Sequence, residues 1–162
     1  MIGFIMVKVL FVCLGNICRS PMAEALFREK VKAKGLEDKI YIASAATGDW
    51  NLGKPPHHGT QEILNEKGIS TKGMIATRIC GDDFEAYDYI LGMDNNNIRD
   101  LKALPPTDQY DSKIHLFLEP LNNPEHTEVP DPYYTGNFEL TYDLVNQGCD
   151  YWLDYIIKNH HL

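Results

Sequence analysis

A cysteine and an arginine are separated by five residues in the segment 13–20, which reads CLGNICRS. Gly15 and Asn16 tolerate left-handed backbone angles, so successive backbone N–H groups of the segment can point inward and hold an anion. Arg19, at the predicted start of a helix, could grip two oxygens of a phosphate group with its planar guanidinium. The spacing therefore indicates a site for a tetrahedral oxyanion with the sulfur of Cys13 at its base.

The thiol of Cys13 is the candidate nucleophile of this site. A helix N-terminus and an arginine both stabilise a thiolate, so we expect this sulfur to be ionised at neutral pH. Ser20 could donate its hydroxyl hydrogen to the thiolate and also cap the helix. A thiolate beneath a bound phosphate ester can attack phosphorus in line, which yields a covalent phosphocysteine.

Motifs for other phosphate sites and for metals are missing from the sequence. No segment has the Walker A pattern or the G-x-G-x-x-G pattern of dinucleotide-binding loops. Cys13, Cys18, His57 and His58 lack the spacing that is usual in zinc sites. We therefore expect a chemistry that needs neither a metal nor a cofactor.

Length and composition predict one globular domain spanning residues 1–162, with 44% hydrophobic and 23% charged residues. The net charge of −8 argues against a nucleic-acid partner. No apolar run is long enough to predict a membrane span, and the apolar N-terminal segment lacks the basic leading region of a signal peptide. The four irregularly spaced cysteines predict reduced thiols, which favours a cytoplasmic location and leaves export without a signal peptide open.

Predicted strands and helices alternate along the chain. Strands are expected at Ile5–Val12, Ile40–Ala43, Tyr87–Met93 and Lys113–Leu118. Helices are expected to begin at Gly59 and after the caps Ser20, Asp94 and Asn137. Residues 45–58 and 119–136 are expected to be irregular. This alternation indicates an α/β domain with a parallel sheet, whose ligands bind beyond the carboxyl ends of the strands.

The segments VCLGNICRSPMAEA and VPDPYYTGNFE together resemble the low-molecular-weight protein tyrosine phosphatases of bacterial type. The segments SAATGDWNLGKPPHHGT and FEAYDYILGMDNNNIRDL extend the similarity over nearly the whole chain. The resemblance implies a four-stranded parallel sheet of order 2-1-3-4, flanked by helices on both faces, with the phosphate-binding loop after strand 1. It also implies a signalling hydrolase that acts on phosphotyrosine in proteins as a monomer or weak dimer, with inorganic phosphate as its product and competitive inhibitor.

The resemblance also assigns a role to individual residues. Cys13 matches the nucleophile, Arg19 the residue that binds phosphate and stabilises the transition state, and Asn16 a residue that shapes the loop. Asp131 matches the general acid, and the chemistry agrees, because one carboxyl can protonate the leaving phenolate and then activate water. The other loop positions that would bind phosphate are Leu14, Gly15, Ile17, Cys18 and Ser20.

A phosphotyrosine ring needs apolar or aromatic walls to reach the floor of such a loop. The candidate walls are Leu14, Ile17, Trp50, Tyr133 and Tyr134, with Asp49 near the rim. Similar enzymes that act on phosphoarginine tend to carry threonine at the position of Ile17 and to lack the paired tyrosines. These positions therefore favour phosphotyrosine as the substrate.

Two further positions bear on redox control and on loop rigidity. Cys18 matches a cysteine that can form a reversible disulfide with the nucleophile, and a thiol that only packs is an equal alternative. Ser44 matches a hydroxyl of the scaffold that supports the loop. Many family members bond a histidine into this scaffold, whereas this chain has Gly73-Met74 in that region, which predicts a thinner or water-filled network.

Two other functions are compatible with the same loop. A thiol-dependent arsenate reductase has a similar fold, but it needs two further cysteines that relay a disulfide, and Cys80 has no partner a few residues away. An inactive phosphate-binding module is the third possibility. Intact Cys13, Arg19 and Asp131 argue against it.

Overall fold

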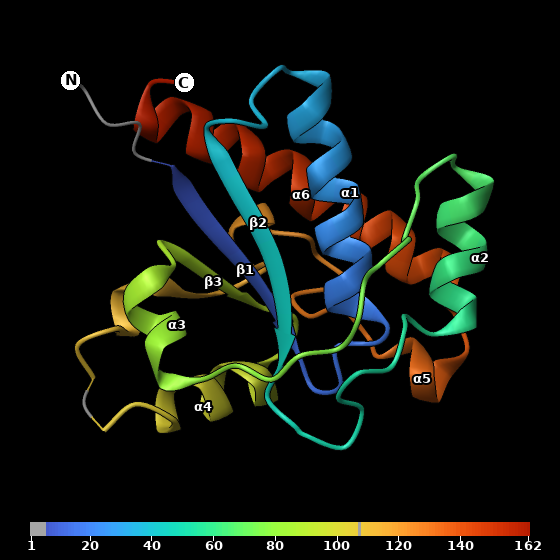
Figure 1. Ribbon diagram of the computed structural model, residues 1–162, viewed down its shortest axis with the longest axis horizontal. Coiled ribbons are helices and arrows are strands. Elements are labelled where there is room, and N and C mark those ends of the chain that lie inside the picture. The colour runs from blue at the N-terminus through green and yellow to red at the C-terminus, as the bar shows by residue number, and fades with distance from the viewer. Residues whose placement is uncertain (1–5, 107) are drawn as a thin grey trace.

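Four parallel strands form the centre of the computed structural model, which describes residues 6–106 and 108–162 (Figure 1). They are β1 (Val7–Cys13), β2 (Ile40–Ala46), β3 (Tyr89–Gly92) and β4 (Ile114–Leu116). Their spatial order is β2-β1-β3-β4, and each neighbouring pair is parallel. The α/β fold and the strand order implied by the resemblance are therefore confirmed.

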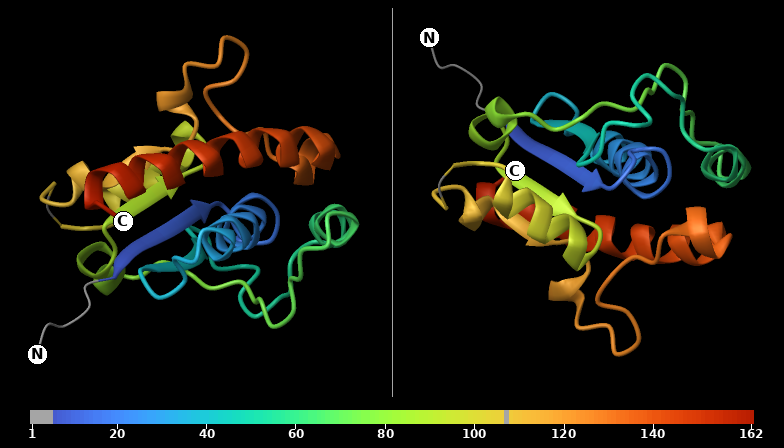
Figure 2. Two further views of the ribbon diagram at one scale, coloured as in Figure 1. Left: turned by 90° about the horizontal axis from the view of Figure 1, so that it is seen from above. Right: turned by 90° about the horizontal axis from the view of Figure 1, so that it is seen from below.

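Helices cover both faces of this sheet (Figures 1 and 2). The helices α1 (Arg19–Ala33) and α6 (Phe138–His160) pack together on one face, and α2 (His58–Glu66) contacts both of them. The opposite face carries α3 (Gly81–Ala86) and α4 (Asn95–Ala103). No helix in the part of the chain that the structure describes is both long and apolar enough to cross a bilayer.

The side chains of β1 alternate between two apolar cores. Val9 and Phe11 join the core beneath α1 and α6, whereas Leu10 and Val12 join the core beneath α3 and α4. All four side chains are buried. A strand buried on both faces reads as a continuous apolar run, which is why this segment is visible in the sequence.

The first two strands extend further than the sequence predicts at their carboxyl ends. The strand expected at residues 5–12 runs to Cys13, while its position 5 lies outside the described residues. The second strand runs to Ala46, because Ala45 and Ala46 pair with the last two residues of β1. The loop expected from residue 45 therefore begins after Ala46.

The later strands are shorter than the sequence predicts. Tyr87 ends α3 instead of opening β3, and Met93 follows β3 as the chain turns toward α4. β4 has only three residues. The segment 119–136, expected to be irregular, contains a 3₁₀ turn at Glu119–Leu121 and the short helix α5 (Pro132–Thr135).

Candidate active site

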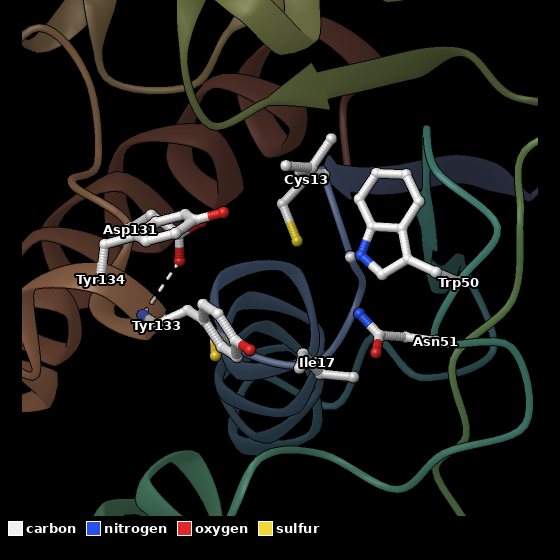
Figure 3. A pocket seen from close by; sticks show the side chains of 10 residues that line it. Cys13, Ile17, Trp50, Asn51, Asp131, Tyr133 and Tyr134 are labelled. Carbon is white, nitrogen blue, oxygen red and sulfur yellow. Dashed lines mark hydrogen bonds between the residues drawn. The ribbon is translucent and has the colours of Figure 1, made fainter.

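A cavity of about 160 Å³ opens at the carboxyl end of β1 (Figure 3). The sulfur of Cys13 points into it, with Asp131 and Tyr134 on one side and Trp50 and Asn51 on the other. The residues that line the cavity are Cys13, Leu14, Gly15, Ile17, Cys18, Trp50, Asn51, Asp131, Tyr133 and Tyr134. The fold therefore joins two segments that lie 112 residues apart in the sequence.

The Cys13 sulfur is almost fully buried and receives two hydrogen-bonding groups. The backbone N–H of Asn16 donates to it over 3.3 Å, and the hydroxyl of Ser20 lies 3.0 Å away. Asn16 has a left-handed backbone with φ of 56°, which turns its N–H toward the sulfur, as the sequence predicts for this position. Both contacts stabilise a thiolate at the floor of the cavity.

The guanidinium of Arg19 is buried beside this sulfur. Its Nη1 donates to the carboxylate of Asp94 over 2.7 Å and to the carbonyl oxygen of Val129 over 2.9 Å, while Nη2 lies 3.4 Å from Asp131. Burial lowers its pKa, but the charge of Cys13 and the contacts with Asp94 and Asp131 outweigh burial, so the pKa of Arg19 is raised. The group therefore stays cationic, with two of its N–H directions fixed by the fold.

One donor of Arg19 has no acceptor among the described residues. Its Nε is buried and makes no hydrogen bond. A buried polar group of this kind normally has a partner, because losing its bonds to water costs free energy. An oxyanion held by the loop would supply that acceptor, so the orphan donor fits the anion site expected from the sequence.

A hydrogen-bond network supports the loop from behind. The side-chain amide of Asn16 donates to the hydroxyls of Ser20, over 2.7 Å, and Ser44, over 2.9 Å, while its oxygen accepts from the backbone N–H of Thr77. The Ser44 hydroxyl in turn donates to Glu24 over 2.6 Å. The network expected to be thinner with Gly73-Met74 is thus completed by Glu24 and Thr77.

The wall opposite Trp50 comes from α5. Asp131 is the N-cap of this helix and accepts from the backbone N–H of Tyr133 over 3.1 Å (Figure 3). Tyr133 and Tyr134 remain 60% and 76% exposed, so their rings can contact a ligand that enters the cavity. A carboxyl group and two aromatic rings therefore stand at the mouth, above the sulfur.

The wall that contains Trp50 differs from the sequence prediction at one position, Asp49. Trp50 lines the cavity, and its ring lies over Gly48, where a Cβ atom would come within 2.4 Å of the ring. Asp49 is exposed and does not line the cavity, because the turn presents Asn51 there instead. Asn51 approaches Gly15 so closely that a Cβ at that position would lie 2.7 Å from its amide nitrogen.

Comparison with known proteins places the chain in a family. A model of the family described as low molecular weight phosphotyrosine protein phosphatase matches residues 8–162. The chain belongs to this family. Among curated members similar to it, YfkJ of Bacillus subtilis, a low molecular weight protein-tyrosine-phosphatase, is 48% identical over 157 residues, covering 97% of this chain and 100% of YfkJ. PtpA of Staphylococcus aureus, named in the same way, is 50% identical over 158 residues, covering 97% and 98% of the two chains.

Solved structures of this phosphatase family have the same fold. The crystal structure of YfkJ from Bacillus subtilis superposes with a TM-score of 0.92 at 48% identity, over 96% of this chain and 97% of YfkJ. The low molecular weight protein tyrosine phosphatase SP-PTP from Streptococcus pyogenes gives a TM-score of 0.83 at 46% identity, over 93% of each chain. The correspondence therefore extends across the domain and is not limited to the loop.

Four residues of this low molecular weight phosphatase join the site without having been predicted there. They are Asp94, which fixes Arg19; Asn51, which lines the cavity; and Glu24 and Thr77, which complete the network. The sequence signals Asp94 only as a helix cap, a role that it also fills by accepting from the backbone N–H of Asn97. The other three carry no local signal, because their contacts depend on how distant segments meet.

The remaining cysteines are free thiols. Burial first, and then the charges of Cys13 and Asp131, raise the pKa of Cys18 to about 12, so this residue is a neutral thiol in the reduced protein. Its disulfide with Cys13 stays a prediction. Cys80 is exposed at the start of α3 and Cys149 is buried in the core, so neither of them lines the cavity as a relay cysteine would.

His57 connects the phosphate-binding loop to the aromatic wall. Its backbone N–H donates to the carbonyl oxygen of Ile17 over 2.7 Å, and its ring stacks on Phe138 and meets the edge of Tyr133. Its Nδ1 accepts from the backbone N–H of Gly59 and so caps α2. This cap needs the neutral ring, because a protonated Nδ1 cannot accept a hydrogen bond.

Low pH should lower the free energy of unfolding, because protonation of His57 removes this helix cap. Burial, followed by the charge of His58, lowers the pKa of His57, so the unfolded chain binds the proton more tightly. The stabilisation from neutral His57 is therefore complete above about pH 6.5 and is lost as the pH falls through the lower folded-state pKa. His57→Asn, which keeps a capping oxygen but cannot titrate, should reduce the loss of unfolding free energy between pH 7.5 and 5.0.

Urea unfolding at several pH values measures this difference. His126→Asn, an equal exchange on the loop before Val129, is the matched control and should keep the wild-type pH dependence. Identical pH dependence of all three proteins would contradict the proposed role of the His57 cap.

Proposed function

We propose that this protein is a protein-tyrosine phosphatase that hydrolyses phosphotyrosine in proteins through a phosphocysteine intermediate. The observation that carries the proposal is the Cys13 sulfur, which points into the cavity from the floor of a loop that also holds the buried guanidinium of Arg19. Membership of the family and the two relatives named protein-tyrosine-phosphatase support it.

The first step transfers the phosphoryl group to sulfur. The Cys13 thiolate attacks phosphorus, a sulfur–phosphorus bond forms, and the bond between phosphorus and the phenolic oxygen breaks. Asp131, in its protonated form, gives its proton to the departing oxygen. Arg19 and the loop N–H groups stabilise the charge on the three equatorial oxygens. The Nε–H of Arg19, which has no acceptor among the described residues, can donate a hydrogen bond to one of these oxygens.

The second step returns the enzyme to its starting state. Asp131, now a carboxylate, accepts a proton from a water molecule whose oxygen attacks phosphorus. The sulfur–phosphorus bond breaks, Cys13 leaves as a thiolate, and inorganic phosphate is released. Phosphate carries the same oxygens as the transferred group, so it should bind the same loop and compete with the substrate.

The cavity walls support an aryl phosphate as the substrate. Leu14, Ile17 and Trp50 offer apolar surface between the mouth and the sulfur, and Tyr133 and Tyr134 extend it outward. A phenyl ring can bury its faces against such walls while its phosphate reaches the loop. Phosphoserine has no ring to fill this space, so the walls select for phosphotyrosine.

Replacing Asp131 by asparagine should slow the release of poor leaving groups. Because general acid catalysis contributes about 10²–10⁴-fold, kcat for phenyl phosphate should fall by about 10²-fold or more. The fall should be much smaller for p-nitrophenyl phosphate, whose phenolate leaves without a proton.

Asp49→Asn is the matched control for this measurement. Asp49 lies two residues from the cavity-lining Asn51 but is itself exposed outside the cavity, so this variant should keep the wild-type ratio of the two substrates. Equal loss of both substrates in Asp131→Asn would contradict its role as the acid.

A turnover comparison tests the proposed substrate class. Peptides carrying phosphotyrosine, phosphoserine or phosphoarginine are hydrolysed by wild-type protein, and reactions with ³²P-labelled phosphotyrosine peptide are quenched to trap phosphocysteine. Phosphotyrosine should be preferred over the other two. Preference for phosphoarginine would move the protein to that substrate class, while arsenate reduction coupled to thiols without phosphatase turnover would replace the proposal.

We also infer that the enzyme works in the cytoplasm. A thiolate nucleophile loses activity on oxidation, and a reducing compartment keeps it and the other free cysteines reduced.

A further inference from the structure

Each hydrogen bond behind the phosphate-binding loop has a defined donor and a defined acceptor. The oxygen of the Asn16 side chain accepts from the backbone N–H of Thr77, so its nitrogen must face Ser20 and Ser44. An amide nitrogen only donates, and both hydroxyl oxygens therefore act as acceptors. Each hydroxyl then has its own hydrogen free to donate elsewhere.

The two free hydroxyl hydrogens have one acceptor each. That of Ser20 faces the sulfur of Cys13 at 3.0 Å, and that of Ser44 faces Oε1 of Glu24 at 2.6 Å. A carboxylate can only accept, so it holds Ser44 with its lone pairs turned toward Asn16. The orientation of the hydroxyl that touches the nucleophile thus depends on a carboxylate on α1, outside the cavity.

Arg28 holds this carboxylate in place. Its Nη2 donates to Oε2 of Glu24 over 2.6 Å and to the carbonyl oxygen of Ile42, on the outer edge of β2, over 3.2 Å. The Glu24 side chain is only 14% exposed, whereas that of Arg28 is 48% exposed. Because the Arg28 side chain is exposed to solvent, this ion pair contributes little to stability, and its main effect is to fix the carboxylate between α1 and β2 beside Ser44.

We propose that Glu24, held by Arg28, is a positioning residue for Cys13, acting through Ser44, Asn16 and Ser20. This inference rests on the proposed function for its effect on turnover, but its effect on the thiol is independent of turnover. The outer end of the network lies in a groove of about 680 Å³ beside β2, which Glu24, Arg28 and Ser44 help to line. Water can reach this groove, so without Glu24 the Ser44 hydroxyl would bond to mobile water and hold Asn16 less firmly.

The test compares four variants on α1. Glu24→Leu removes the acceptor, Glu24→Gln keeps an acceptor oxygen without the charge, and Arg28→Leu removes only the partner that holds the carboxylate. Glu29→Leu, an equal exchange at an exposed position of the same helix, is the matched control. Three measurements are made on each: kcat and KM for p-nitrophenyl phosphate, the pH profile of Cys13 alkylation by iodoacetamide, and the midpoint of thermal unfolding.

Glu24→Leu should lower kcat by about tenfold, the scale of one charge-assisted hydrogen bond, with KM changed less than twofold. Its alkylation profile should move to higher pH. Glu24→Gln should recover part of both losses, Arg28→Leu should show a smaller loss of about two- to threefold, and Glu29→Leu should match the wild type.

An unchanged alkylation profile and an unchanged kcat in Glu24→Leu would overturn the proposal, even if thermal stability falls. A residue with a purely structural role would give that pattern. Equal losses in Glu29→Leu would overturn it as well. Because alkylation needs no phosphatase turnover, a shifted profile in a protein without turnover would uphold the positioning role and reject the proposed function instead.

Discussion

Replacing Cys13 by serine should abolish turnover of aryl phosphates, with a loss of about 10⁴-fold or more in kcat. A serine hydroxyl stays protonated at neutral pH, so it offers no anion for attack on phosphorus, and no covalent intermediate forms. The exchange is nearly isosteric, and Ser20 and the Asn16 N–H can still contact the smaller oxygen. The fold should therefore survive, and phosphate should still bind.

Steady-state kinetics and thermal unfolding together check this result. Cys80→Ser is the matched control, since Cys80 is exposed at the start of α3 and serine is a good helix cap. The control should keep full turnover. Phosphatase activity that persists in Cys13→Ser, above the background of a preparation from cells that lack the protein, would contradict the proposed nucleophile.

Replacing Arg19 by lysine should lower kcat/KM by about 10³-fold although the positive charge is kept. A guanidinium presents several N–H groups in a fixed plane, so it can hold Asp94 and Val129 through one nitrogen and still meet phosphate oxygens with the others. A lysine ammonium is a point charge with three hydrogens and cannot satisfy both sets. Loss of an aligned donor to a charge that develops in the transition state typically costs about 10²–10³-fold.

Competition by inorganic phosphate separates binding from catalysis in this variant. The inhibition constant of phosphate should rise in Arg19→Lys, because the product uses the same donors as the transferred group. Arg99→Lys is the control, because Arg99 is exposed on α4 and its side chain donates to Asn96. This variant should keep the wild-type kcat/KM and the wild-type inhibition constant of phosphate. If the inhibition constant of phosphate in Arg19→Lys equalled that of the wild type, the guanidinium of Arg19 would not contact the anion.

Local features of the site could be predicted because they depend on neighbouring residues. Asn16 adopts the left-handed angle expected of it, and Asp94 and Asn137 cap the helices that follow them. The strand before Cys13 is visible because burial on both faces requires an apolar run. The role of Asp131 could not be derived in this way, since by itself Asp131-Pro132 indicates only a turn, and its assignment came from family resemblance.

The sequence did not predict the strand boundaries and site contacts that depend on pairing between distant segments. β2 ends at Ala46 and not at Ala43 because its last residues pair with the end of β1, and this pairing is not encoded in β2 alone. Asn51 replaces Asp49 at the cavity for a similar reason, since the direction of each side chain depends on how the turn packs against Gly15. Completion of the loop network by Glu24 and Thr77 requires α1, β2 and the segment after α2 to meet.

The sequence by itself determined the chemistry of the loop, because a nucleophile, a tight backbone turn and a guanidinium lie within eight consecutive residues. The tertiary structure alone decided which groups hold the guanidinium and the loop in place. Arg19 meets Asp94, Val129 and Asp131 across separations of 75 to 112 residues. Those contacts exist because parallel strands place their carboxyl ends at one edge of the sheet, and crossover connections bring the following loops together there.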